Sequence, residues 1–180
     1  MDELREASSE ETSAERLLEL VSSRSVEVRY QLAWNDSCPP EVLSQLVSDP
    51  DEGVREIIVG RADCPLEALL RAASDESGGV REEVANHQSC PPEALAKLST
   101  DEGWWIRLAV ARHPNCPAQV LSGFLLDQTR DVRLAAAENP NLDPVDLEQV
   151  ILAVDGDVRQ AIAARDDVAD HVKAAAVLAL

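Results

Sequence analysis

Aromatic residues and lysines are scarce in this sequence. Its 180 residues include three Trp, one Tyr and one Phe, so a core of any size has to be aliphatic. Ala and Leu rank high in helix propensity, and their abundance favours close-packed helices over sheets. The only lysines are Lys97 and Lys173, and the formal net charge is −18. Since phosphate contacts need clustered Lys and Arg, we expect no nucleic-acid partner and no anionic membrane surface.

Long apolar runs and targeting signals are also missing. The longest apolar stretch, 174–180, is far shorter than the roughly 20 residues that a membrane span needs. The first residues are acidic and lack the apolar centre of a signal peptide. We therefore expect a soluble, cytoplasmic protein without membrane contact.

Catalytic signatures are absent as well. The sequence contains no HExxH, no phosphate-binding GxGxxG or GxxxxGK, and no GxSxG turn. Carboxylates are plentiful, but they fall on expected turns and helix faces that water solvates. The sequence thus predicts a protein that is not an enzyme and has no catalytic residues and no cofactor.

What the sequence does contain is a repeat of 26 residues. Val-Arg or Ile-Arg recurs without a slip at 28–29, 54–55, 80–81, 106–107, 132–133 and 158–159. Units of fixed period cannot bury their apolar faces alone, so they stack on their neighbours. We expect a single repeat domain over 13–180, with a half unit at 13–27 and units starting at 28, 54, 80, 106, 132 and 158. Residues 1–12, rich in acid and Ser, are expected to form a disordered tail.

Each unit contains two helical stretches. The first is expected to begin at Val-Arg and to run for about two turns. The second begins after Cys-Pro, where a proline in the first turn sacrifices no hydrogen bond. Within the second stretch, two apolar positions recur in every unit. The first column is Leu43, Leu69, Leu95, Leu121 and Leu147, and the second column, three residues later, is Leu46, Ala72, Leu98, Phe124 and Val150. No alternating strand pattern competes, so the sequence predicts an all-α solenoid of about six two-helix units.

The pattern VRxxVAxxPxCPxxxLxxLxxDxxxx resembles the leucine-rich repeat variant family over roughly residues 13–180. The match is best in the unit that starts at Ile106-Arg107 and ends near Asp127. The resemblance implies a right-handed superhelix in which the second helix of each unit is wholly or partly 3₁₀, and it implies no enzymatic activity. Asp and Arg six residues apart are also similar to HEAT repeats, which would make both helices α. One relative holds an iron–sulfur cluster on a cysteine-rich segment ahead of its repeats, but here no cysteine precedes Cys38, so no cluster is expected.

The four cysteines, one per unit, are expected to be core residues. Stacked helices lie roughly 8–10 Å apart, which is too far for a disulfide or for a shared zinc ion. Two later units carry Leu142 and Val168 at the same position, as expected of a small buried apolar slot. We therefore expect no metal site at Cys38, Cys64, Cys90 and Cys116.

The repeated arginines admit two interpretations, an anion-binding stripe or an internal ladder. Their regular spacing from an Asp six residues earlier, as in Asp49/Arg55 and Asp127/Arg133, favours the ladder. In it, each guanidinium would bridge turn carboxylates or carbonyls between units.

Positions that vary between units remain available for function. Trp34 occupies a place where other units have residues as different as Gly60 and Glu138, and Trp104-Trp105 falls in an expected turn between units. Tryptophan is frequent in binding hot spots. The alternative is that each indole folds over the edge of its own unit. Three polar residues at the end of the first helix complete the candidate partner-binding surface, namely Arg61, His87 and His113.

The sequence therefore predicts a scaffold that binds a protein or peptide, and its charge favours a basic partner. The first alternative is a structural or assembly protein that self-associates through its apolar C-terminal end. The second is an accessory protein that binds a small ligand through Arg61, His87 and His113.

Overall fold

The computed structural model describes residues 2–151 and 154–178, without the side chains of 148–150, and these residues form α-helices and no strand. The chain divides into two compact units, Met1–Pro91 and Pro92–Leu180, where the sequence predicts one domain. The first unit contains α1 (Glu3–Ala7), α2 (Ala14–Leu20), α3 (Val26–Trp34), α4 (Pro40–Leu46), α5 (Glu52–Gly60), α6 (Leu66–Ala72) and α7 (Gly78–Asn86). The second contains α8 (Pro92–Leu98), α9 (Trp104–Arg112), α10 (Ala118–Phe124), α11 (Arg130–Glu138), α12 (Pro144–Val150), α13 (Gly156–Ala163) and α14 (Asp170–Leu178).

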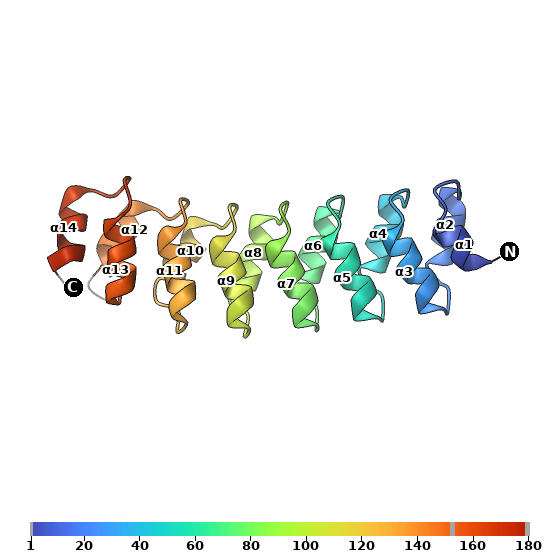
Figure 1. Cartoon of the computed structure of the whole chain (residues 1–180), viewed down its shortest axis with the longest axis horizontal. Coiled ribbons are helices and arrows are strands. Elements are labelled where there is room, and N and C mark those ends of the chain that lie inside the picture. The colour runs from blue at the N-terminus through green and yellow to red at the C-terminus, as the bar shows by residue number, and fades with distance from the viewer. Residues whose placement is uncertain (1, 152–153, 179–180) are drawn as a thin grey trace. The chain divides into compact units, whose positions relative to one another are not determined.

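Within each unit the helices pack in chain order. In the first unit α3, α5 and α7 lie side by side, and α4 and α6 form a second row behind them (Figure 1). In the second unit α9, α11 and α13 form the corresponding front row, and α13 packs against α14. The predicted all-α fold of stacked two-helix repeats is therefore confirmed.

The first helix of each repeat begins two residues before Val-Arg, so the predicted starting point was wrong. At α3, α5 and α13 a polar N-cap side chain explains the earlier start, because Ser25, Asp51 and Asp155 accept hydrogen bonds from the unpaired first-turn amides. The Asp51 carboxylate accepts from the N–H of Gly53 at 3.0 Å and of Val54 at 3.2 Å. The second helix begins behind Pro39, Pro65 or Pro117, and both helices are α wherever the structure describes them.

The core is aliphatic, as the composition requires. Leu43, Leu69, Leu95, Leu121 and Leu147 are all buried, which confirms the first column. The second column is buried at its first four positions, and the side chain of Val150 lies outside the described residues. Each repeat thus presents the same apolar face to the next one.

An arginine–aspartate ladder ties successive repeats together within each unit. Arg55 donates from Nε and Nη2 to both carboxylate oxygens of Asp75, at 2.7 and 2.8 Å, and from Nη1 to the carbonyl of Asp49 at 2.8 Å. Arg29 makes the same bidentate contact with Asp49, and Arg107 makes it with Asp127. The internal ladder is therefore confirmed. The Asp six residues earlier supplies its carbonyl, whereas the carboxylate comes from the Asp 20 residues later.

Each ladder aspartate also holds a turn. Oδ1 of Asp75 accepts from the N–H of Ser77 at 2.8 Å, and Oδ1 of Asp127 accepts from the N–H of Thr129 at 2.7 Å. Burial by itself raises the pKa of both carboxyls, but the hydrogen bonds from Arg55 or Arg107 and from the turn amides outweigh it and lower the pKa. Both groups are thus held in the charged form that the ladder needs.

Residues 2–12 contain helix α1, where the sequence predicts a disordered tail. Ala7 is fully buried, and α1 packs against α2 and α3. The Asn35 side chain donates to the carbonyls of Ala7 at 2.8 Å and Ser9 at 3.2 Å. The segment is short of apolar residues, but its backbone carbonyls serve as acceptors for the next repeat.

Replacing Arg55 by Ala should lower the free energy of unfolding by about 3 kcal/mol, because it leaves the buried Asp75 carboxylate without its guanidinium. Chemical denaturation followed by circular dichroism measures the change. Arg24→Ala is the matched control, since Arg24 is exposed in the same unit, and it should stay within about 0.5 kcal/mol of the parent protein. Equal stabilities for the two variants would contradict the ladder's role.

Candidate functional site

The four cysteines line the interior and are not a reactive site. Cys38, Cys64, Cys90 and Cys116 are all buried and form no disulfide, and Leu142 and Val168 at the equivalent position are buried too, so the predicted apolar slot is confirmed. Burial raises the pKa of the Cys90 and Cys116 thiols to about 12. A thiol that stays protonated at neutral pH is a poor nucleophile.

A second ladder runs through the residues that end the first helix of each repeat. We call these residues the cap stripe: Asn35, Arg61, His87, His113, Asn139 and Arg165. Arg61 donates from Nη1 to the carbonyls of Ala33 at 2.8 Å and Asn35 at 3.2 Å, which lie 28 and 26 residues earlier. Asn139 makes the equivalent bonds to Ala111 and His113. Within each compact unit, the cap stripe therefore joins the first helix of a repeat to the end of the first helix of the previous repeat.

The histidines of the cap stripe are held in one tautomer. Nδ1 of His87 accepts from the backbone N–H of Ser89 at 3.1 Å, so the ring proton lies on Nε2. Nε2 then donates to the carbonyl of Arg61 at 2.9 Å. Nδ1 of His113 likewise accepts from the N–H of Asn115 at 3.0 Å.

The residue two places after the cap stripe changes with it. Asn and His offer an acceptor for the N–H two residues on, but Arg has none. Where the stripe residue is Arg61 or Arg165, the second residue after it is Asp63 or Asp167, which pairs with the guanidinium at 2.8 and 2.6 Å. Elsewhere that residue is Ser or Asn. This pairing is visible in the sequence and was the signal that could have identified the stripe as structural.

Arg61, His87 and His113, which the sequence predicts as part of a partner-binding surface, are mostly buried and make hydrogen bonds within the chain. His87 and His113 are buried, and the Arg61 side chain is 10% exposed. Their polar atoms bond to neighbouring backbone and to Asp63. The same contacts take away the residues on which the small-ligand alternative depended.

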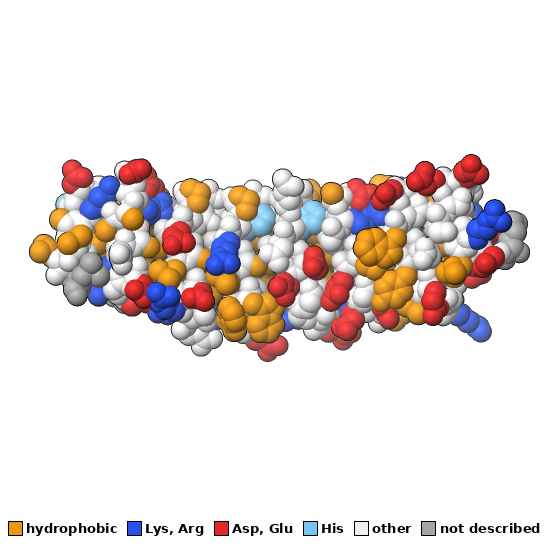
Figure 2. Space-filling view, viewed as in Figure 1, with side chains coloured by type: hydrophobic (Ala, Val, Ile, Leu, Met, Phe, Trp, Pro, Cys, Tyr) orange, Lys and Arg blue, Asp and Glu red, His pale blue; other side chains and the backbone are white. Residues whose placement is uncertain are grey.

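The three tryptophans, in contrast, are exposed. Trp34 ends α3 with 66% of its surface accessible, and Trp104 and Trp105 are 46% and 44% exposed. On the face shown in Figure 2, hydrophobic side chains gather over α3 and over α9, with acidic side chains around them. Large exposed aromatic surfaces on a protein with an otherwise aliphatic core are typical of contact residues.

Trp104 and Trp105 are the first two residues of α9, so they do not lie in a turn between repeats as the sequence predicts. Their rings pack edge to face, with centroids 6.3 Å apart and an angle of 89° between the planes. Trp105 also lies across Gly103, because a Cβ at that position would meet its ring at 3.0 Å. The expectation that an indole covers the edge of its own repeat thus holds in part for Trp105, yet nearly half of the surface of each tryptophan stays accessible.

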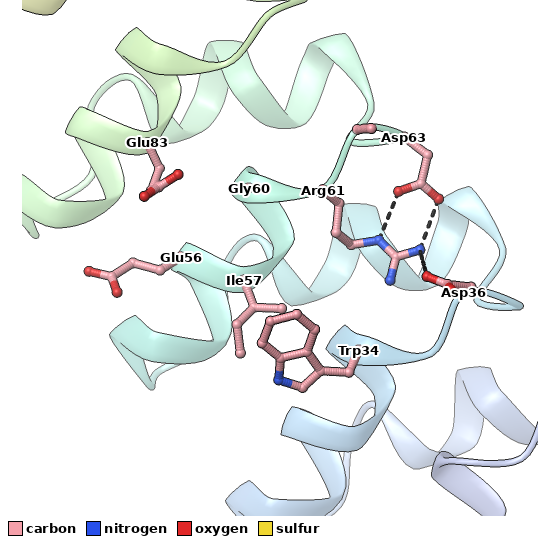
Figure 3. Close-up of a pocket in the computed structure, with 9 residues that line it drawn as sticks. Trp34, Asp36, Glu56, Ile57, Gly60, Arg61, Asp63 and Glu83 are labelled. Carbon is pink, nitrogen blue, oxygen red and sulfur yellow. Dashed lines mark hydrogen bonds and ion pairs between the residues drawn. The ribbon is translucent and has the colours of Figure 1, made fainter.

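Trp34 borders a surface hollow of about 610 Å³ within the first unit. We call it the Trp34 hollow, and its other walls include Ile57, Gly60, Glu56 and Glu83. Figure 3 shows the indole beside Ile57. Glu56 and Glu83 lie on one side of Gly60, and the Arg61–Asp63 pair lies on the other side. Of the lining residues, sequence reasoning found Trp34 and Arg61 as candidates. It also noted Gly60 at the position equivalent to Trp34, but it missed that the neighbouring repeat therefore has no side chain beside the indole.

In the described part of the chain, no three His, Cys, Asp or Glu side chains converge as metal ligands. Among the same residues no helix has the length and apolar character needed to cross a bilayer.

One solved structure is clearly similar to this chain. It is described as a leucine-rich repeat variant with a novel repetitive protein structural motif, and it aligns with 95% of this chain and 73% of its own at 29% identity and a TM-score of 0.63. The predicted resemblance is confirmed. Two engineered proteins, each 20% identical, align over 92% and 99% of this chain and over 56% and 86% of their own length. Their TM-scores of 0.47 and 0.32 are too low to support an inference about this chain. No protein-family model and no curated protein matches the sequence.

The internal comparison of repeats predicts which replacement of His87 is tolerated. His87→Asn should keep the free energy of unfolding within about 0.5 kcal/mol, because Asn35 and Asn139 make the same acceptor and donor contacts. His87→Ala should cost about 2 kcal/mol, since it leaves buried backbone groups unpaired. Urea denaturation of both variants provides the measurement. If Asn were as damaging as Ala, the cap stripe would not act through these hydrogen bonds.

Proposed function

With a leucine-rich repeat variant as its structural neighbour, we propose that this chain is a non-enzymatic helical-repeat scaffold that binds a protein or peptide partner. The observation that carries the proposal is the exposure of Trp34, Trp104 and Trp105 on first helices whose other large apolar side chains are mostly buried. Indoles contribute large contact areas with few rotatable bonds, which makes them effective anchors.

The structural role of the repeated polar residues supports the same proposal by elimination. The ladder arginines and the cap stripe use their donors on neighbouring repeats. The thiols are buried and protonated. Side chains available for recognition are therefore the indoles and the carboxylates around them.

The charge of the chain sets the class of partner. A net charge of −18 repels acidic partners and increases the rate of encounter with basic ones. We therefore expect the partner to present a basic segment, and to contact aromatic surface once it has docked.

Affinity capture tests the proposal. The parent chain should retain a partner from a lysate of its source, and replacement of Trp104 and Trp105 by Ala, or of Trp34 by Ala, should reduce the captured amount at least severalfold. The physical reason is the loss of buried contact area that an indole provides, which costs about 2 kcal/mol or more at a hot spot.

Leu126→Ala is the matched control for this capture. Leu126 is 60% exposed and lies outside α9, so its removal also trims exposed apolar surface without touching an indole. A partner retained equally by all the variants would bind elsewhere, and the tryptophan surface would lose its assigned role.

A second candidate function is self-association through α14. Val177 and Leu178 are 59% and 88% exposed, whereas Ala179 and Leu180 lie outside the described residues. If this surface mediates assembly, light scattering should show a mass that rises with concentration and returns to the monomer value in Leu178→Asp. A monomeric parent protein at high concentration would exclude this candidate.

A further inference from the structure

The Trp34 hollow combines an exposed aromatic face with an excess of carboxylates. Four acidic residues line it, namely Asp36, Glu56, Asp63 and Glu83, against the single guanidinium of Arg61. Arg61 is already bound to Asp63 through two hydrogen bonds of 2.8 and 2.9 Å and lies 3.9 Å from Asp36. The remaining carboxylates, Glu56 and Glu83, have no ion-pair partner among the described residues.

The hollow exists because of one missing side chain. Trp34 and Gly60 are equivalent positions of adjacent repeats, and the next equivalent is Asn86. At Gly60 a methyl group would meet only Oε2 of Glu83, at 3.6 Å, which is ordinary van der Waals contact and not a clash. Its backbone φ is not positive, and glycine is therefore not required there by conformation. Gly60 leaves room for a ligand beside the indole.

An aromatic face with carboxylates around it matches a flat cation. Guanidinium groups stack on indole faces and donate to carboxylates in pairs, whereas ammonium groups are compact and strongly hydrated. In Figure 3 Glu83 lies on the side of Gly60 away from Arg61, and the Glu56 carboxylate points away from the indole, against Gly79. That side of the hollow therefore has no lining cation. The chemistry therefore favours arginine over lysine.

We propose that the Trp34 hollow binds an arginine side chain of the partner, with the guanidinium stacked on Trp34 and directed to Glu83, whose carboxylate lies beside Gly60. The inference rests on the proposed scaffold function and names the chemical class that one of its contact sites takes. The wider negative charge of the protein draws the basic segment in, and the hollow selects its side chain.

The test uses a fluorescently labelled hexa-arginine peptide as the probe, with binding followed by anisotropy at low ionic strength. Trp34→Ala and Gly60→Asn should each weaken binding about fivefold, because the first removes the stacking face and the second fills the space beside it. Both variants keep the net charge of the parent chain, so general attraction is unchanged. Hexa-lysine has the same charge as the probe. It should bind the parent chain more weakly than hexa-arginine does, whereas the two peptides should bind Trp34→Ala equally.

Glu67→Gln is the control for loss of one carboxylate, because Glu67 is exposed on α6 and does not line the hollow. It should bind hexa-arginine within twofold of the parent, whereas Glu83→Gln should bind more weakly than Glu67→Gln. Thermal unfolding by circular dichroism should confirm that the variants fold. Asn at position 60 is the residue that the next repeat carries, so Gly60→Asn is expected to be tolerated.

Hexa-arginine binding that is the same in the parent chain, Trp34→Ala and Gly60→Asn would overturn the inference, and so would no measurable binding to the parent chain. Either result would leave the scaffold proposal standing if a captured partner still depended on Trp104 and Trp105. Loss of that dependence, with hexa-arginine still requiring Trp34, would instead refute the larger surface and keep the arginine site.

Discussion

The arginine–aspartate ladder is the interaction on which the rest of the structure depends: each arginine binds the aspartate of its own repeat through two hydrogen bonds and the carbonyl of the previous repeat's aspartate through a third. One aspartate binds the preceding arginine through its carboxylate, caps its own turn through Oδ1 and accepts the following arginine at its carbonyl. Each link therefore fixes a turn and a helix orientation at once. Apolar stacking alone has no such direction, because aliphatic contacts are not angle-dependent.

The ladder changes its aspartate partner where the sequence departs from the repeat pattern. Arg133 would find its aspartate at position 153, but that residue is Ala153, and Arg133 pairs with Asp155 instead. The pair is more exposed than the one at Arg55 and Asp75. The same Asp155 caps α13 by accepting from the N–H of Val158 at 3.1 Å. The carboxylate's combined role is thus preserved when its position shifts.

Function is confined to what the two ladders leave unused. Arginine, asparagine and histidine would ordinarily be the first residues considered for recognition, yet here they hold repeats together. The indoles and the unpaired carboxylates remain. The net charge of −18 is the basis of the proposal that the partner is basic.

The sequence by itself determined the period, the helical class, the aliphatic columns and the buried cysteine slot, because these follow from spacing and side-chain chemistry within one repeat. Only the tertiary structure decided the partners of the cap stripe, since its acceptors are backbone carbonyls 26–28 residues earlier and carry no sequence signature. It also decided that Trp104 and Trp105 open a helix and that Trp34 faces the space left by Gly60. Exposure of a side chain depends on what the adjacent repeat places beside it, and one repeat read alone does not contain that information.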